Sequence, residues 1–295
     1  MIHDIEKLIE YFSVFGGLGW NIDIDAPLEK LIQTEILDNF GSLYNQITEL
    51  TTNDPQYIRL LTKLAQGDRR IFSAFNKSGL SNLSGGLSLK HLQEVGVLEA
   101  EYSREQPPAK DGNQRKREVA RHRISHKMRF TSPFLRFWFY FIAPMAKEIE
   151  LGHYEKVIEY FHQHHQAFVG YTFEELSNEM LCLKLSSLQL IDSGSYWDRH
   201  VEIDLMATTL DNKLIVGECK WKNHKMNKKE LHKLHEKCEK VHFSPDIILF
   251  FAKRGFSKEF LHMKDKSLRL YSCDDFEDLL SNVSQADLIQ GFSRP

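Results

Sequence analysis

The chain has 295 residues, of which 42% are hydrophobic, and its formal net charge at pH 7 is -3. This length is enough to bury one large core or, as we expect here, two. The near-balanced charge excludes a globally basic protein, so any nucleic-acid binding must come from local patches.

Several classes of protein are excluded by features that the sequence lacks. No apolar run is long enough to span a membrane, and the N-terminus has neither the basic nor the apolar region of a signal peptide. The four cysteines are scattered without zinc-ligand spacing, which is typical of reduced thiols in the cytosol. No P-loop motif G-x-x-x-x-G-K-[ST] is present. We therefore expect a cytoplasmic protein without membrane contact.

Residues 1–55 are predicted to form short helices. Leu28, Leu31 and Ile32 recur at helical spacing, and a glycine turn at residues 15–20 interrupts the pattern.

Residues 56–132 have the pattern of a winged helix. Three short helices, each closed by a glycine, are followed by two strands that form a β-wing. We expect the third helix to place Leu83, Leu87, Leu92 and Val95 on or near one face. The predicted helices are 56–66, 69–77 and 81–96, and the predicted strands are 97–102 and 126–130.

Basic residues are concentrated in the predicted wing. Between residues 115 and 129 there are seven Lys or Arg residues against one acid. A wing of this composition can bind DNA phosphates, but a solvated loop would have the same composition, and both interpretations stay open. On the third helix Lys90 could also face a groove, although surface polarity explains it more simply. The candidate DNA contacts in this region are Lys90, Arg115, Lys116, Arg117, Arg121, Arg123 and Lys127.

Residues 133–168 form a predicted aromatic connector. The aromatic side chains of residues 134–142 are expected to pack the winged helix against the next domain, and a helix should follow at 146–165. His162, His164 and His165 have metal-compatible spacing but no acid or cysteine partner, so we expect them at the surface.

The sequence pattern of residues 169–295 predicts an α/β or α+β domain with a mixed central sheet. The order of its elements is α-β-β-β-α-β, and the apolar strand at 246–252 should be buried on both faces. The predicted helices are 172–183, 225–241 and 274–280. The predicted strands are 185–191, 201–207, 214–221, 246–252 and 267–271.

The hairpin of this domain carries Asp204 on its first strand and Glu218 and Lys220 on its second. Side chains alternate between faces along a strand, so Glu218 and Lys220 share one side. A turn centred near Asp211 would set Asp204 opposite Glu218, with Cβ atoms roughly 5 Å apart. Two carboxylates and a lysine would then converge within otherwise apolar strands.

These residue types suit metal-assisted cleavage of a phosphodiester. Asp204, Glu218 and the backbone carbonyl of Cys219 can provide the oxygen ligands that Mg²⁺ or Mn²⁺ requires. Lys220 can orient a water or stabilise negative charge in the transition state. A further acid, Glu174 or Glu175, is expected in the first turn of a helix capped by Thr172.

Asp204, Glu218-x-Lys220 and Glu174 on the preceding helix resemble the motif of the PD-(D/E)XK nuclease superfamily. The resemblance implies a Mg²⁺-dependent DNA endonuclease or exonuclease, with Asp204, Glu218 and Lys220 as the acid, acid and lysine of the motif and Glu174 as its helix glutamate. The sequence departs from the pattern at Ile203, where the superfamily often has proline.

The aromatic stretch 134–142, Phe173-Glu174, Ile203-Asp204 and residues 217–221 are also similar to the DUF234 domain. That domain usually forms the C-terminal part of archaeal-type AAA+ ATPases, and residues 1–55 resemble the lid segment of those proteins. The ATPase core is missing from this sequence, so nucleotide binding is not implied.

Lysines that follow the hairpin would line the path of a DNA backbone in a nuclease, although a solvated helix face is the alternative. They are Lys222, Lys225, Lys228 and Lys229. The nuclease hypothesis therefore has DNA as its partner and Mg²⁺ or Mn²⁺ as its cofactor. Two other hypotheses are a non-catalytic DNA-binding protein with a nuclease-like fold and an accessory subunit of a separate ATPase. A homo-oligomer is also compatible with the sequence.

Overall fold

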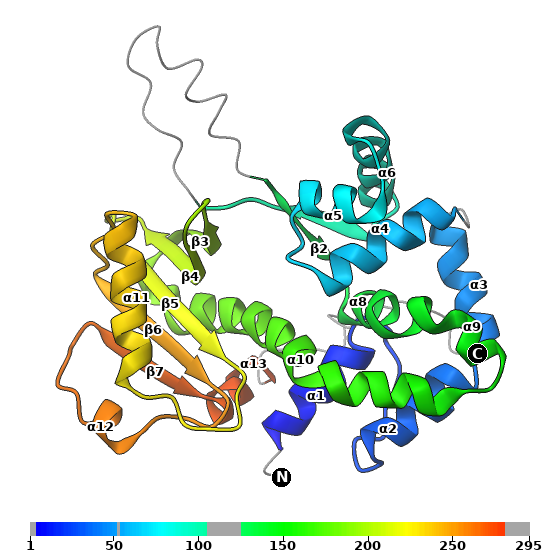
Figure 1. The fold of residues 1–295 in the computed structure, drawn as a ribbon. Coiled ribbons are helices and arrows are strands. Elements are labelled where there is room, and N and C mark those ends of the chain that lie inside the picture. The colour runs from blue at the N-terminus through cyan, green and yellow to red at the C-terminus, as the bar shows by residue number, and fades with distance from the viewer. Residues whose placement is uncertain (1–3, 52–53, 105–124, 281–295) are drawn as a thin grey trace, which may run out of the picture.

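The computed structural model describes residues 4–51, 54–104 and 125–280 (Figure 1). It confirms a mixed fold of helices and strands, with a five-stranded mixed sheet and a separate two-stranded antiparallel sheet. In the described part of the chain, no helix combines the length and the apolar character needed to cross a bilayer.

The N-terminal segment forms short helices, as predicted. Asp4 caps the first of them by accepting a hydrogen bond from the Lys7 amide, and the glycine turn ends it, with positive φ angles at Gly17 and Gly19. This first helix packs against a segment near residue 253, where Lys253 Nζ lies 2.8 Å from a carboxylate oxygen of Glu6. The elements are α1 (Ile5–Phe15), α2 (Leu28–Leu31), a π-helical turn (Ile32–Leu37) and α3 (Phe40–Leu50).

The winged-helix region, which we define as residues 54–104 and 125–132, has its three helices and two strands in the predicted order. The apolar residues of the third helix do not share one environment, because Leu83 and Leu87 are 77% and 63% exposed whereas Leu92 is buried. The helix instead turns Gly85 inward, where an added Cβ would lie 2.5 Å from the Phe75 ring. The elements are α4 (Pro55–Gln66), α5 (Ile71–Ser78), α6 (Asn82–Glu94), β1 (Leu98–Glu101) and β2 (Lys127–Phe130).

The aromatic connector forms a hydrophobic core, as predicted. Phe137 and Phe141 lie with their ring centroids 5.3 Å apart, and both contact Phe161 and Phe168 of the following helix. The connector elements are α8 (Pro133–Phe137), a π-helical turn (Trp138–Ile142), a 3-10 turn (Ala143–Met145) and α9 (Ala146–Glu150).

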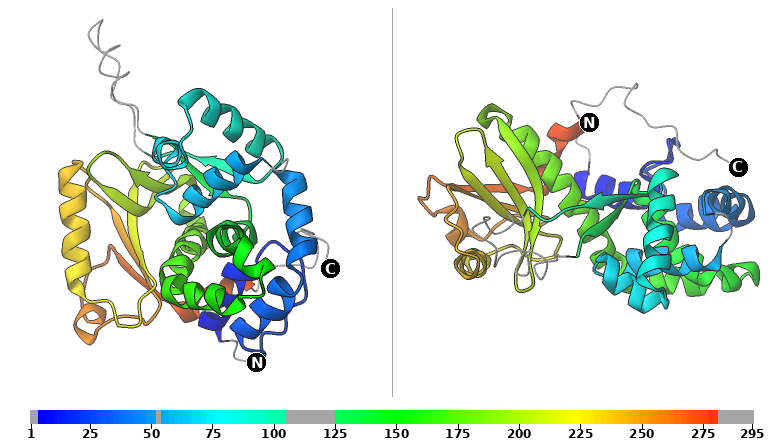
Figure 2. Two further views of the ribbon diagram at one scale, coloured as in Figure 1. Left: turned by 45° about the vertical axis from the view of Figure 1, so that its right-hand side comes forward. Right: turned by 90° about the horizontal axis from the view of Figure 1, so that it is seen from above.

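One helix, α10 (Tyr154–Lys184), replaces the two helices predicted at 146–165 and 172–183. Gly170, which lies between the two predicted helices, is helical, since packing along both halves outweighs the cost of roughly 1 kcal/mol for a helical glycine. Thr172 is therefore not a cap but a buried residue within the helix. Figure 2 shows α10 running from the helical part of the molecule to the sheet.

The central sheet has the strand order β3-β4-β5-β6-β7. β3, β4 and β5 are antiparallel neighbours, whereas β5, β6 and β7 run parallel. The predicted strand 185–191 begins later, at Leu190, because a 3-10 turn (Ser186–Leu188) follows α10. The strands are β3 (Leu190–Trp197), β4 (Glu202–Thr209), β5 (Leu214–Lys220), β6 (Ile247–Ala252) and β7 (Leu268–Ser272).

Helices cover both faces of this sheet. Leu205, Ile215 and Phe251 share a core with α10, whereas Val216 and Phe250 share one with Leu231 and Leu234 of the basic helix. Strand β6 is consequently buried on both sides, as predicted. The remaining elements are α11 (Lys228–Lys240), α12 (Lys258–Leu261), a 3-10 turn (Cys273–Phe276) and α13 (Glu277–Leu280).

Gly217 is expected to be irreplaceable in the middle of β5. An added Cβ would lie 2.9 Å from the Leu249 carbonyl oxygen and 3.0 Å from Leu249 Cβ. Gly217→Ala should therefore lower the free energy of unfolding by about 1–3 kcal/mol, measured by urea denaturation. Gly86→Ala in α6 is the matched control: a Cβ there meets nothing within 4 Å, so this change should raise stability by about 0.5–1 kcal/mol. Equal effects of the two changes would contradict the packing described for β5.

Candidate active site

A β-bulge in β4 positions Asp204. Tyr196 pairs with Ile203 and Gly194 with Met206, so two steps along β3 correspond to three along β4. Asp204 and Leu205 therefore share the single position opposite Ser195. Such a bulge bends the strand and redirects a side chain. Here it turns Asp204 toward the neighbouring strand β5.

Asp204, Glu218 and Lys220 converge, as predicted. The pairing of β4 with β5 reaches Leu205 and Gly217, and beyond it the Asp204 carboxylate accepts a hydrogen bond of 2.9 Å from the Cys219 amide. Lys220 Nζ lies 3.3 Å from Asp204 Oδ2 and 2.7 Å from Glu218 Oε2. The ammonium group thus bridges the two carboxylates.

Glu218 is 4% exposed and has a second cationic partner, Lys237 of α11. Burial and the neighbouring Asp204 charge raise the pKa of Glu218, against the influence of the two lysines. Burial alone would lower the pKa of Lys220, but Asp204 and Glu218 raise it above its ordinary value. Lys237 was not among the predicted site residues. The sequence contains one indication of its role: Lys237 lies three residues after the buried Leu234. This spacing puts it beside the face of α11 that packs on the sheet.

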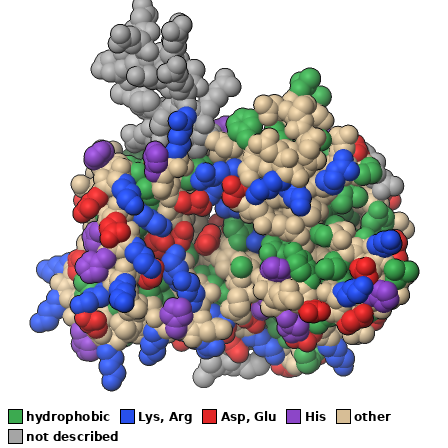
Figure 3. All heavy atoms as spheres, viewed as in Figure 1, with side chains coloured by type: hydrophobic (Ala, Val, Ile, Leu, Met, Phe, Trp, Pro, Cys, Tyr) green, Lys and Arg blue, Asp and Glu red, His purple; other side chains and the backbone are tan. Residues whose placement is uncertain are grey.

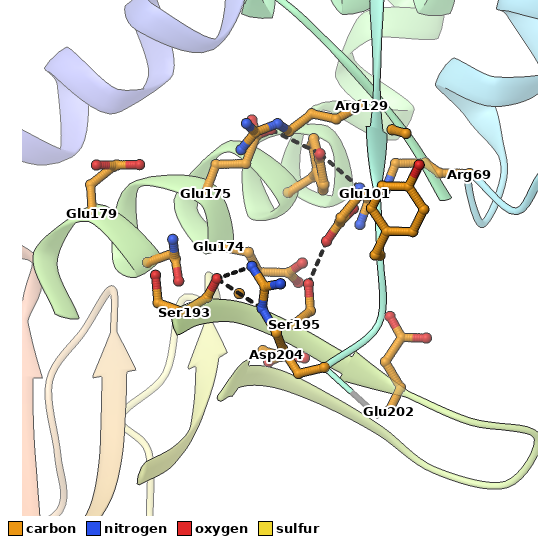
Figure 4. Close-up of a pocket in the computed structure, with 16 residues that line it drawn as sticks. Arg69, Glu101, Arg129, Glu174, Glu175, Glu179, Ser193, Ser195, Glu202 and Asp204 are labelled. Carbon is orange, nitrogen blue, oxygen red and sulfur yellow. Dashed lines mark hydrogen bonds and ion pairs between the residues drawn. The ribbon is translucent and has the colours of Figure 1, made fainter. Parts of the chain in front are cut away.

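Glu174 lies on α10 and lines a cavity of about 260 Å³ together with Asp204 (Figure 4). Burial, followed by the Asp204 charge, raises the pKa of Glu174 to about 8. The alternative acid, Glu175, also lines this cavity but accepts a hydrogen bond from the Tyr171 hydroxyl. Glu174 is therefore the helix acid whose charge interacts with the hairpin.

The winged-helix region covers this cavity. Arg69 Nη1 contacts both Glu101 and the Tyr171 hydroxyl, and Glu101 accepts a hydrogen bond from Ser195 of β3 (Figure 4). These groups form a charged wall between β1, α10 and the sheet. None of the wall was expected, because it depends on how distant parts of the chain pack together.

The same region also pairs with the free edge of β3. Ser103 Oγ donates a hydrogen bond to the Trp197 carbonyl and accepts one from the Trp197 amide. The Arg104 amide donates to the Ser195 carbonyl, and its guanidinium donates to Ser193. Residues 103–104 thus lie along the outer edge of the sheet.

Lys127 is not an exposed wing residue, and this expectation was wrong. It is 1% exposed, its Nζ contacts Glu202 and its ammonium lies 4.4 Å from the Trp197 ring centroid. A buried, paired lysine is unavailable to DNA phosphates in this structure. The other candidates in the wing lie outside the described residues: Arg115, Lys116, Arg117, Arg121 and Arg123.

The remaining basic candidates are at the surface. Lys90 is exposed on α6, lies 3.8 Å from Glu94 and does not line the acidic cavity. Lysines near the end of β5 and the start of α11 are also exposed, and Lys228 contacts Glu259. Figure 3 shows basic side chains over this part of the molecule, beside a hollow with acidic side chains. The exposed set comprises Lys222, Lys225, Lys228 and Lys229.

The donor chemistry fits a hard divalent cation. Carboxylates suit such an ion, and the raised pKa values of Glu174 and Glu218 indicate that negative charge is disfavoured at these buried positions, which a bound cation would offset. Lys220 provides that cation here. Among the described residues, no three acidic, histidine or cysteine side chains are grouped closely enough to enclose a metal ion. Metal binding would therefore require Lys220 to move from between Asp204 and Glu218.

The three histidines of α10 do not form a metal site in this part of the structure. His162 Nε2 lies 3.3 Å from Glu29, and His164 packs on Tyr140 and Tyr160. His165 packs against Phe161 and is partly buried, contrary to the expected surface position.

Residues 138–234 match the DUF234 family, which is described as archaeal and bacterial proteins of unknown function. The matched segment contains α10 and the hairpin and ends within α11. The crystal structure of protein VC1899 from Vibrio cholerae is similar with a TM-score of 0.31 and 15% identity, over 99% of this chain and 58% of that protein. The chain thus spans little more than half of VC1899. Among curated proteins, no relative matches.

Glu174→Gln should change the pH dependence of stability. Folded Glu174 keeps its proton to about pH 8, whereas in the unfolded chain the proton leaves near the ordinary value of 4.5. Between these values this residue makes the free energy of unfolding fall as pH rises, by up to about 1.4 kcal/mol per pH unit. Glutamine stays neutral, so the variant does not lose stability in this way as pH rises. Its free energy of unfolding relative to wild type should therefore increase from pH 5 to pH 9.

Urea denaturation at pH 5, 7 and 9 measures this difference. Glu179→Gln is the control, because Glu179 is an exposed acid on the same helix. A stability difference between Glu174→Gln and wild type that does not vary with pH would contradict the raised pKa.

Proposed function

We propose that this protein is a divalent-metal-dependent DNA nuclease that hydrolyses phosphodiester bonds. The observation that carries the proposal is the convergence of Asp204, Glu218 and Lys220 at the bulge, where pairing between β4 and β5 ends. Buried charges are costly, and apolar side chains of similar volume at these positions would often stabilise the strands as well or better. This cost supports a chemical role for them. The resemblance to the PD-(D/E)XK motif supports the same reaction.

Asp204 and Glu218 would hold the metal, together with the backbone of Cys219. A bound Mg²⁺ or Mn²⁺ would neutralise charge on the phosphate and make a water more acidic. Lys220, released from its two carboxylates, could then donate a hydrogen bond to the phosphate or to the attacking water. Glu174 lies beside Asp204 and can accept a proton once it is ionised.

DNA would approach over the exposed lysines next to the hairpin. Lys222 and Lys225 line a small depression together with Lys220, so their charges lie close to the proposed reaction centre. Contacts of this kind bind the phosphate backbone without reading sequence. Lys90 and the wing residues would belong to a second contact surface.

Cleavage of plasmid and single-stranded DNA with Mg²⁺ or Mn²⁺ tests the proposal. Glu218→Gln and Lys220→Met should each reduce the rate by about 10²-fold or more, because each removes charge from the reaction centre. Asp204→Asn should have a similar effect, whereas Asp211→Asn, the same change at the exposed turn of the hairpin, should leave the rate unchanged. Wild-type protein that cuts with neither metal, or a Glu218→Gln variant that cuts at the wild-type rate, would refute the proposal.

One observation favours a second candidate function, a non-catalytic DNA-binding protein. Lys220 and Lys237 already pair with the carboxylates, so the cluster is balanced without a metal. DNA binding that is independent of metal and unchanged in Asp204→Asn, in the absence of cleavage, would support this function.

A further inference from the structure

A second cavity, of about 330 Å³, adjoins the first and contains a buried arginine. The two cavities share Arg69, Tyr171, Glu174 and Glu202 in their walls. The second is bounded by the end of α4 and the loop after it, by the aromatic connector and by the middle of α10. Arg136 of the connector lies in its wall.

Arg136 lacks an anionic partner. It is 7% exposed, and one of its terminal nitrogens donates a hydrogen bond of 2.9 Å to the Phe168 carbonyl. Its Nε is buried without a hydrogen-bond partner. In residues 4–51, 54–104 and 125–280, no carboxylate lies within ion-pair distance of this guanidinium. The guanidinium is therefore buried without an ion-pair partner, and Glu175 acts on it only from beyond ion-pair distance.

Aromatic contacts offset only part of this cost. The guanidinium carbon lies 4.2 Å from the Phe168 ring centroid and 4.3 Å from that of Tyr171. Such contacts are weaker than the cost of leaving a buried charge unpaired. Burial also lowers the pKa of Arg136 to about 10. The guanidinium itself thus lacks a close anion, although Asp68, Glu174 and Glu202 also line the cavity.

The other cations in the cavity wall have partners. Arg69 pairs with Glu101, and Lys127 pairs with Glu202. Asp68 accepts a hydrogen bond from the Arg70 amide. Arg136 is consequently the group in this wall with which an entering anion could pair most favourably.

We propose that this cavity binds a phosphate group and that Arg136 is its principal ligand. A planar guanidinium forms two parallel hydrogen bonds to phosphate oxygens, and its buried Nε is free to supply one of them. The cavity is larger than a phosphate ion, so the group could be free or attached to a nucleotide at the end of a DNA strand. The inference goes beyond the proposed cleavage and does not depend on it.

Thermal unfolding in inorganic phosphate tests the site. At constant ionic strength maintained with chloride, phosphate should raise the Tm of the wild-type protein by several degrees and in a saturable way. Arg136→Met replaces the guanidinium with an apolar side chain and so removes the charge. The variant should show no increase in Tm with phosphate.

A substitution at the cavity mouth keeps the test decisive if Arg136→Met does not fold. Ala167 is exposed and lines the same cavity. Ala167→Glu should supply the missing anion, raise the Tm without phosphate and abolish the phosphate response. The matched neutral variant, Ala167→Gln, should retain the response. A wild-type protein without a phosphate-specific shift, or a shift that survives in Ala167→Glu, would overturn the proposal.

Oligonucleotides distinguish the two sources of phosphate. Fluorescence anisotropy in a metal chelator compares strands with a 5′-phosphate, a 3′-phosphate or no terminal phosphate. Tighter binding of one phosphorylated strand, by about tenfold and lost in Ala167→Glu, assigns the site to a strand end. Equal binding of all three strands, with the thermal shift retained, assigns it to free phosphate. Loss of cleavage in every assay would remove the proposed nuclease but leave these binding results intact.

Discussion

The whole structure depends on the continuity of α10. Its first half packs its phenylalanines against the aromatic connector, and its second half packs against the central sheet, where Phe173 contacts Trp221 with ring centroids 5.1 Å apart. One rigid rod therefore sets the position of the sheet relative to the helical part. Glu174 directly follows Phe173, so the packing of this half of α10 against the sheet holds it beside Asp204.

Electrostatic balance is the second constraint. The three acids and two lysines around the bulge come from β4, β5, α10 and α11, and β5 alone contributes charges of both signs. The Asp204 charge raises the pKa of Glu174 and of Glu218, and Lys220 opposes that effect. Such a cluster favours one arrangement of the sheet and its helices, because shifting any element would leave a buried charge without its partner.

Much of the sheet could be predicted because it depends on local rules. Alternation of side chains and a short turn placed Asp204 near Glu218 and Lys220, and the apolar run of β6 indicated its burial. The errors have long-range causes. Gly170 remains helical because two cores hold it, and Lys127 is buried because the winged-helix region docks onto Glu202. The cavity and its wall could not be derived from spacing, because their residues come from distant segments of the chain.

The contact of residues 103–104 with β3 has a consequence for solubility. β3 is an outer strand, and an outer strand with free amides and carbonyls can recruit a strand from another molecule. Ser103 and Arg104 occupy some of those groups with hydrogen bonds from within the same chain. Any motion that lifted the winged-helix region off the cavity would also uncover this edge. A single motion would therefore both open the site and expose a strand edge that is prone to aggregation.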